Sequence, residues 1–155
     1  MLATLLVGAI HTAALFTTDP ELLLALLNDR RHGRGLATCV ALCIQSDGRV
    51  ALSSAGHPPP YLNGEAIPVE GSLPLGVIPG MIYPARLFRL AENDLIILIT
   101  DGVAEAKNAS GRLYGFDRIE KMLSRGATAS ALATSAQKFG QDDDITVLSI
   151  RCFSA

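Results

Sequence analysis

Acidic residues stand at the ends of two apolar segments, and their type and spacing could support chemistry. Asp101 follows the apolar run at residues 95–99 after a single threonine, and three aspartates at 142–144 directly precede the run at 145–150. Carboxylate oxygens are the ligands that Mg²⁺ and Mn²⁺ prefer. If the two runs are neighbouring antiparallel strands, Asp101 and the aspartate cluster meet at one edge of a sheet. Gly102 would then leave room for a water or a substrate beside Asp101.

Ordinary turns are the alternative interpretation of the same residues. An Asp-Gly pair after a strand is common in turns, and a short acidic run before a strand is usually solvated. The sequence pattern alone leaves both interpretations of Asp101 and of the aspartate cluster open.

His57, in the segment AGHPPP, is a second candidate for chemistry. A single loop histidine is more often held by a structural hydrogen bond than used in catalysis. No serine, cysteine or second histidine is placed to pair with His57 as a nucleophile or base. His11, in an apolar segment, and His32, in a basic loop, are weaker candidates.

Composition restricts the class of protein. The 155 residues are 49% hydrophobic and 18% charged, which is typical of a packed globular domain. The net charge of −2 gives no reason to expect binding to nucleic acid or to an anionic membrane. The three cysteines are an odd number without the spacing of metal ligands, so we expect a reduced, cytoplasmic setting.

The first sixteen residues are almost wholly apolar. They are shorter than the roughly 20 residues that a membrane-spanning helix needs, and no basic segment precedes them, so we expect no membrane span. A helix that is apolar on every side is predicted to be buried on every side.

The remaining segments predict an α+β fold with a largely antiparallel sheet in one domain. Thr18-Asp19-Pro20 is typical of a helix start, and Asp47-Gly48 is typical of a β-hairpin turn. The expected elements, in chain order, are a helix at 20–30, strands at 36–45 and 49–55, a loop at 56–60, short strands and turns at 61–80, strands at 85–90 and 95–100, a loop, helices at 116–125 and 130–139, and a strand at 144–152.

Four motifs in this order resemble a known family. They are SSAGHPPPYL, SLPLGV, NDLIILITDGVAEAKNASGRLYGFDRI and QDDDITVLSIR. Together they resemble the PPM (type 2C) serine/threonine protein phosphatases, most closely the sporulation stage II protein E class (SpoIIE/RsbU-like). The resemblance runs from Met1 to the C-terminus and implies an α/β/β/α sandwich of largely antiparallel sheets.

The resemblance also implies a site and a reaction. In such phosphatases two metal ions, Mn²⁺ or Mg²⁺, activate a water that attacks the phosphorus of phosphoserine or phosphothreonine in line, so no protein nucleophile is needed. The family's metal-binding aspartates fall on Asp101 and Asp143, which would share one metal. Gly102 and Asp144 lie next to this site. The implied substrate is a phosphoprotein such as an anti-sigma-factor antagonist.

One family signature has no counterpart in the sequence. No Asp-x-x-Gly-His-Gly segment, whose aspartate bridges both metals, is present in the 155 residues. We therefore expect residues 1–155 to form a partial, N-terminally truncated PPM-type domain that holds at most one metal weakly and is impaired in catalysis. A non-catalytic module that binds and regulates a signalling partner is the alternative. Missing covering strands would expose Leu2, Leu5, Leu6 and Ile10 and favour self-association.

Overall fold

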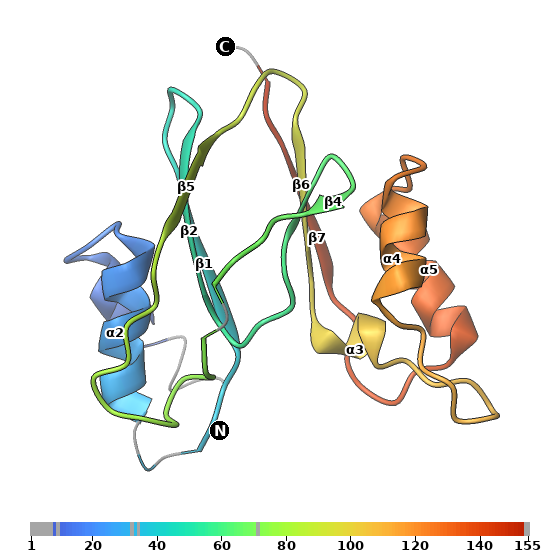
Figure 1. Cartoon of the computed structure of the whole chain (residues 1–155), viewed down its shortest axis with the longest axis horizontal. Helices are drawn as coiled ribbons and strands as arrows, with labels where there is room; N and C mark the ends of the chain where they lie inside the picture. The colour runs from blue at the N-terminus through green and yellow to red at the C-terminus, as the bar shows by residue number, and fades with distance from the viewer. Residues whose placement is uncertain (1–7, 9, 32, 34, 71, 154–155) are drawn as a thin grey trace. The chain divides into compact units, whose positions relative to one another are not determined.

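The structure of the chain is a computed structural model that describes residues 8, 10–31, 33, 35–70 and 72–153 (Figure 1). Contacts between residues divide the chain into two units. The first consists of Met1–His57 and Val69–Leu90, and the second of Pro58–Pro68 and Ala91–Ala155. The assignment of residues 1–155 to one partial domain stays a prediction.

The first unit places a helix on a three-stranded sheet. Helix α2 (Pro20–Arg31) lies along one face of β1 (Cys39–Ile44), β2 (Arg49–Ala55) and β5 (Arg86–Arg89), which pair antiparallel in the order β1-β2-β5 (Figure 1). The predicted hairpin is confirmed, because Ile44 pairs with Val50 and Gly48 between them has a φ of +83°.

The sequence at the start of α2 explains why the helix begins there. The Asp19 carboxylate accepts a hydrogen bond from the Glu21 backbone N–H (2.9 Å), and the Thr17 hydroxyl accepts one from the Asp19 N–H (3.0 Å). These side chains satisfy amide groups that have no partner within the helix. The predicted helix start is confirmed.

Side chains of α2 also hold the segment at residues 76–85. Asn28 is fully buried, and its amide bonds to the backbone of Gly76 and Ile78 and to the Tyr83 hydroxyl. Around it lies the core of the first unit, which consists of Leu24, Leu27, Ala55, Leu75 and Tyr83.

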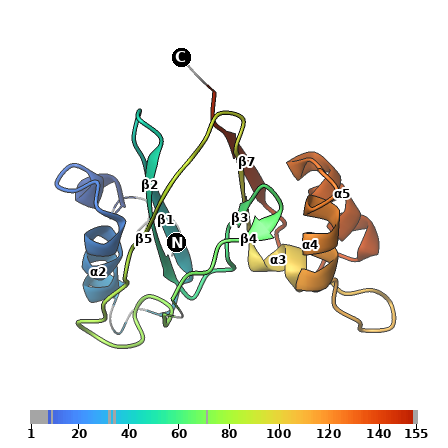
Figure 2. The same cartoon turned by 45° about the horizontal axis from the view of Figure 1, so that its top comes forward.

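The second unit places helices against a four-stranded antiparallel sheet in the order β4-β3-β6-β7 (Figures 1 and 2). The strands are β3 (Tyr61–Leu62), β4 (Glu65–Ala66), β6 (Leu95–Ile99) and β7 (Val147–Arg151). The helices are α3 (Asp101–Ala104), α4 (Phe116–Leu123) and α5 (Ala129–Phe139). Their buried core consists of Tyr61, Ile97, Ile99, Val103, Ala104, Ala106, Tyr114, Ile119, Leu123, Leu132 and Ala136.

The predicted α+β class with antiparallel pairing is confirmed, and two local predictions are wrong. A short helix, α3, begins at Asp101, where a loop was expected. Strand β7 begins at Val147 instead of Asp144, because the Asp144 N–H bonds to the Asp143 side chain and the Asp144 carbonyl accepts the Thr100 hydroxyl.

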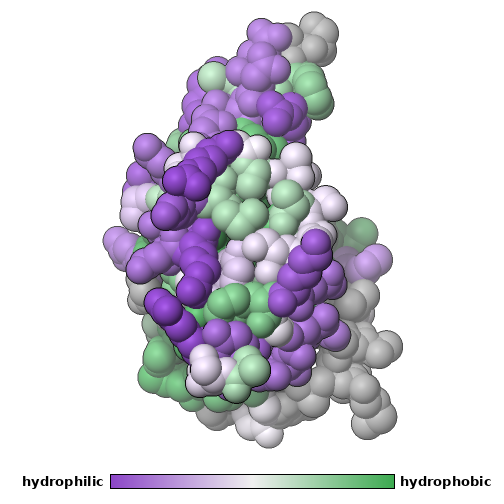
Figure 3. Space-filling view, turned by 90° about the vertical axis from the view of Figure 1, so that its right-hand side faces the viewer, coloured by the Kyte–Doolittle hydropathy of each residue, from purple (hydrophilic) through white to green (hydrophobic). Residues whose placement is uncertain are grey.

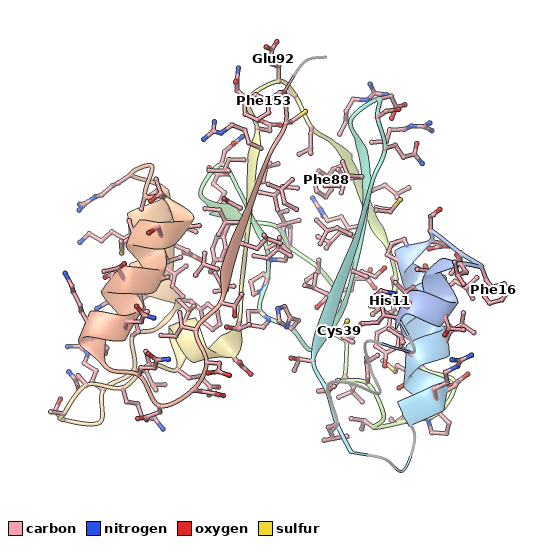
Figure 4. All side chains as sticks on the ribbon, turned by 180° about the vertical axis from the view of Figure 1, so that it is seen from behind. His11, Phe16, Cys39, Phe88, Glu92 and Phe153 are labelled. Atoms are coloured by element: carbon pink, nitrogen blue, oxygen red, sulfur yellow. The ribbon has the colours of Figure 1, made fainter. Side chains whose placement is uncertain are left out.

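The N-terminal apolar segment is helical at Gly8 and at residues 10–14. Its described part is not buried on every side, since Leu15 and Phe16 are 82% and 80% exposed. Figure 4 shows the Phe16 ring at the outer side of this segment. Only one side of the segment, with Ile10 partly and Ala13 fully buried, packs inward. The other residues predicted to form an exposed apolar face, Leu2, Leu5 and Leu6, lie outside the described residues.

Within the described residues, none of the helices combines the length and the apolar character that crossing a membrane would require.

Candidate metal site at the β6–β7 edge

The two apolar runs that carry the aspartates are neighbouring antiparallel strands. Strands β6 and β7 pair from Leu95 opposite Arg151 to Ile99 opposite Val147. Apolar side chains of β6 are buried against the helices of the second unit, which fixes the face and therefore the register of the pair. The C-terminal end of β6 thus lies beside the N-terminal start of β7. The segments that contain Asp101 and Asp143 meet there, as the sequence predicted.

Thr100 joins these segments beyond the last pair of the strands. Its backbone N–H donates to the Thr146 carbonyl (3.0 Å), and its hydroxyl accepts from the Thr146 N–H (2.9 Å). The same hydroxyl lies 3.2 Å from the Asp144 carbonyl oxygen and 3.4 Å from that of Thr146. One side chain therefore holds the segment before β7 against the start of α3.

Gly102 brings the same segments into direct contact. A Cβ atom at this position would lie 3.1 Å from the Asp144 carbonyl carbon and 3.6 Å from that of Asp143, and closer still to the Asp144 carbonyl oxygen. The expectation that Gly102 leaves room for a water or a substrate is therefore wrong. The backbone of Asp144 fills the space where a side chain would stand.

Asp101 and Asp143 each use one carboxylate oxygen locally. Asp101 Oδ1 accepts the Gly102 N–H (3.0 Å), and Asp143 Oδ1 accepts the Asp144 N–H (2.7 Å). Both side chains are exposed, and neither Oδ2 forms a hydrogen bond or an ion pair with another described residue. Asp142 differs, because its Oδ2 lies 3.9 Å from the Lys107 ammonium group.

This donor set fits a hard divalent cation held by two carboxylates and several waters. Mg²⁺ in proteins often has such a coordination, with few protein ligands. Among the residues that the structure describes, no group of three or more His, Cys, Asp or Glu side chains is arranged to hold a metal ion. The assignment of Asp101 and Asp143 as metal ligands therefore stays a prediction.

His57 belongs to the first unit, and its imidazole contacts another side chain there. The Nδ1 atom lies 3.3 Å from the Thr38 hydroxyl, and the His57 carbonyl accepts the Ser54 hydroxyl (3.4 Å). These contacts are those of a structural histidine, the interpretation that the sequence favoured. A catalytic role for His57 stays a prediction.

Thr100 is the residue of this site that the sequence analysis overlooked. A threonine between a buried strand and an aspartate is the only signal that could have identified it. Such a residue can bond across the strand end with its hydroxyl as well as with its backbone.

A protein family model matches the chain over almost its whole length. The family model described as "Stage II sporulation protein E (SpoIIE)" matches residues 1–153. A search of curated proteins gave no significant match.

Several solved structures are similar to the chain. The SiaA PP2C domain of Pseudomonas aeruginosa has a TM-score of 0.78 at 23% identity, with 96% of this chain and 68% of that one covered. The RsbU and RsbW domains of Rv1364c from Mycobacterium tuberculosis give 0.69 at 26%, with 94% and 46% covered. The PP2C phosphatase domain with a regulatory fragment of SpoIIE from Bacillus subtilis gives 0.79 at 17%, with 96% and 49% covered. The chain thus spans between about half and two thirds of these structures.

Proposed function

The chain belongs to the stage II sporulation protein E family of PPM-type protein phosphatase domains, and we propose that it acts in metal-dependent hydrolysis of phosphoserine or phosphothreonine on a regulatory protein. We further propose that Asp101 and Asp143 are its metal ligands. The partner would be a cytoplasmic phosphoprotein of the anti-sigma-factor-antagonist type.

The meeting of the two aspartate segments at the β6–β7 edge is the observation that supports this proposal. Hydrogen bonds of Thr100 and the close approach of Gly102 to Asp144 hold these segments together. A pair of unrelated turns would need neither feature. The free Oδ2 atoms of Asp101 and Asp143 are the donors that a cation would use.

A divalent ion at such a site would activate water and offset negative charge on a phosphoryl group. The chain's own contribution is to position two carboxylates before an ion arrives. Their Oδ1 atoms are oriented by the N–H groups of the residues that follow them, so little side-chain freedom remains to be lost on binding.

We propose that turnover by the 155-residue chain is slow. The sequence lacks the Asp-x-x-Gly-His-Gly segment that would supply the bridging carboxylate of a two-metal site. Removal of that ligand would affect both the second metal and the orientation of the attacking water.

Metal binding and turnover should be measured separately. Mn²⁺ titrated into the chain in a calorimeter should bind weakly, and Asp101→Asn or Asp143→Asn should weaken binding by roughly tenfold or more. Asp117→Asn, which removes an exposed carboxylate from α4, is the matched control and should leave the affinity unchanged. Unchanged binding in both site variants would contradict the assignment of these ligands.

Hydrolysis of a phosphoserine peptide should be followed with Mn²⁺ and with a chelator. We expect a low rate in this chain, and a much higher, Asp101-dependent rate after an Asp-x-x-Gly-His-Gly segment is joined ahead of residue 1. Equal rates in the short and extended chains would contradict the two-metal argument. Phosphopeptide binding without turnover in both chains would favour a non-catalytic binding module.

A further inference from the structure

Four basic side chains line a groove between α4 and α5, away from the chemistry proposed above. On one side of the groove, Arg118, Lys121 and Met122 of α4 follow the spacing i, i+3, i+4 and so share one face of the helix, and Arg125 lies in the turn just after it. On the other side of the groove, α5 presents Ser135, Lys138 and Phe139, also at helical spacing.

The groove between these faces has a volume of about 540 Å³. Besides the cations it is lined by Tyr114, which is almost fully buried, and by Met122 and Phe139, which are partly buried. Figure 3 shows this side of the molecule, where apolar and neutral surface lies between ridges of hydrophilic side chains. Met122 and Phe139 are therefore partly accessible beside the basic side chains.

The groove has a fixed architecture at its centre. Arg118 donates to the carbonyls of Leu113 (2.9 Å) and Tyr114 (2.7 Å), and its guanidinium lies 4.7 Å from the Phe139 ring centroid. The Tyr114 and Phe139 rings meet edge to face at 5.4 Å, and the Tyr114 hydroxyl donates to Ser135 (2.8 Å). A surface held in this way loses little entropy when a partner binds.

The positive charge of the groove is not neutralised locally. Arg118, Lys121, Arg125 and Lys138 form no ion pair with any described residue. The only acidic residues of α4, Asp117 and Glu120, are not among the residues that line the groove. Four cations therefore gather on one surface of a chain whose net charge is −2.

We propose that this basic groove binds an acidic, partly apolar segment of a partner protein. Carboxylates of the segment would pair with the four cations, and an apolar side chain would lie on Met122 and Phe139. Methionine adapts its shape to such a contact, and complementary charge sets the partner and the rate of association. Single-stranded nucleic acid, whose phosphates pair with cations and whose bases stack on aromatic side chains, is the competing class of ligand, and the test below includes it. This inference goes beyond the proposed hydrolysis and does not depend on it.

The test is a fluorescence anisotropy titration of the 155-residue chain with labelled peptides. The probe is the synthetic peptide Glu-Glu-Leu-Glu-Glu-Phe-Glu-Glu, and its comparison peptides carry lysine for glutamate, or serine for leucine and phenylalanine. Lys121→Glu/Arg125→Glu should weaken binding of the probe by at least about fivefold, because both side chains are exposed and reverse their charge. The double variant Arg86→Glu/Arg112→Glu makes the same charge change at exposed positions outside the groove.

Each outcome bears on the proposal. Support requires that the groove variant loses affinity, that the control variant keeps it, and that the serine peptide binds more weakly than the probe. Equal loss in both double variants would overturn the proposal, because the effect would be one of net charge alone. Tighter, Lys121- and Arg125-dependent binding of a twelve-nucleotide single-stranded DNA than of the probe would overturn it in favour of a nucleic-acid surface.

Discussion

Replacing Gly102 by alanine tests whether the two aspartate segments are held in contact. The new Cβ atom would lie 3.1 Å from the carbonyl carbon of Asp144 and closer to its oxygen. Both groups are backbone, so no flexible side chain can rotate away. The segment before β7 must move away from α3, or α3 must shift from the end of β6.

Two measurable effects follow from this displacement. Forcing a methyl group into a closely packed site costs about 1–3 kcal/mol, so the free energy of unfolding in urea without metal should fall by that amount. The Asp143 carboxylate moves with its segment, so Mn²⁺ affinity measured by calorimetry should fall by roughly tenfold or more.

Gly8→Ala is the matched control for the added methyl group. Gly8 is helical, and a Cβ atom there would have no neighbour within 4 Å among the residues that the structure describes. Its replacement should leave Mn²⁺ affinity unchanged and raise stability by up to about 1 kcal/mol, because alanine is the better helix former. If Gly102→Ala kept both its stability and its Mn²⁺ affinity, the contact between α3 and Asp144 would not exist as described.

Three further substitutions test single interactions. Thr100→Val removes the side-chain hydrogen bonds across the strand end, in which one hydroxyl accepts from the Thr146 N–H and shares its single proton between the Asp144 and Thr146 carbonyls. It should lower the free energy of unfolding in urea by about 1–3 kcal/mol, and an unchanged value would contradict this role. Tyr61→Phe removes a buried hydroxyl that has no partner among the described residues, and should stabilise the protein by about 1 kcal/mol at pH 7. Burial, and then the charge of Glu120, raises the pKa of Tyr61 in the folded protein to about 12. Tyrosine in the unfolded chain ionises at about pH 10, so the wild type should lose stability as the pH rises from about 10 to 12. The free energy of unfolding of Tyr61→Phe, measured in urea, should therefore exceed that of the wild type by a growing amount over that range. A constant difference would be inconsistent with a raised pKa of Tyr61. Asp94→Asn should cost about 0.5–1.5 kcal/mol at pH 7, because the Asn63 amide (2.7 Å) stabilises the charged carboxylate and lowers its pKa below 3.8. The difference in free energy of unfolding between the wild type and Asp94→Asn should be fully present above about pH 4 and should disappear as the pH falls through the lowered pKa of Asp94. Urea unfolding curves at pH 2 and pH 7 would test this.

Local sequence signals predicted those elements whose cause is local. The Asp19 side chain caps α2, and Asp47-Gly48 supplies the positive φ that the β1–β2 turn requires. The buried run at β6 predicted a strand, and its antiparallel pairing with β7 places the ends of the segments that carry the aspartates side by side as expected. Each of these inferences used residues only a few positions apart, or a simple rule of strand pairing.

Features that depend on distant contacts were not predictable in this way. Gly102 contacts the backbone of Asp144, which lies 42 positions further along the chain. The local sequence does not reveal this contact, so the glycine was expected to leave room for a water or a substrate. Helix α3 is only four residues long and has no apolar period that would reveal it. The helical spacing of Arg118, Lys121 and Arg125 in the sequence predicts that they share one face. The groove, in contrast, forms only because α5 packs beside α4.

The buried amide of Asn28 links the position of α2 to the conformation of the segment at residues 76–83. Its oxygen accepts from the Gly76 N–H (2.9 Å) and the Tyr83 hydroxyl (3.0 Å), and its nitrogen donates to the Ile78 carbonyl (2.8 Å). Sliding α2 along its axis would break all three bonds at once and leave polar groups buried without partners. The helix and the segment therefore move as one body or separate in an all-or-none step. Deuterium exchange at the Gly76 amide would report directly on how often α2 detaches.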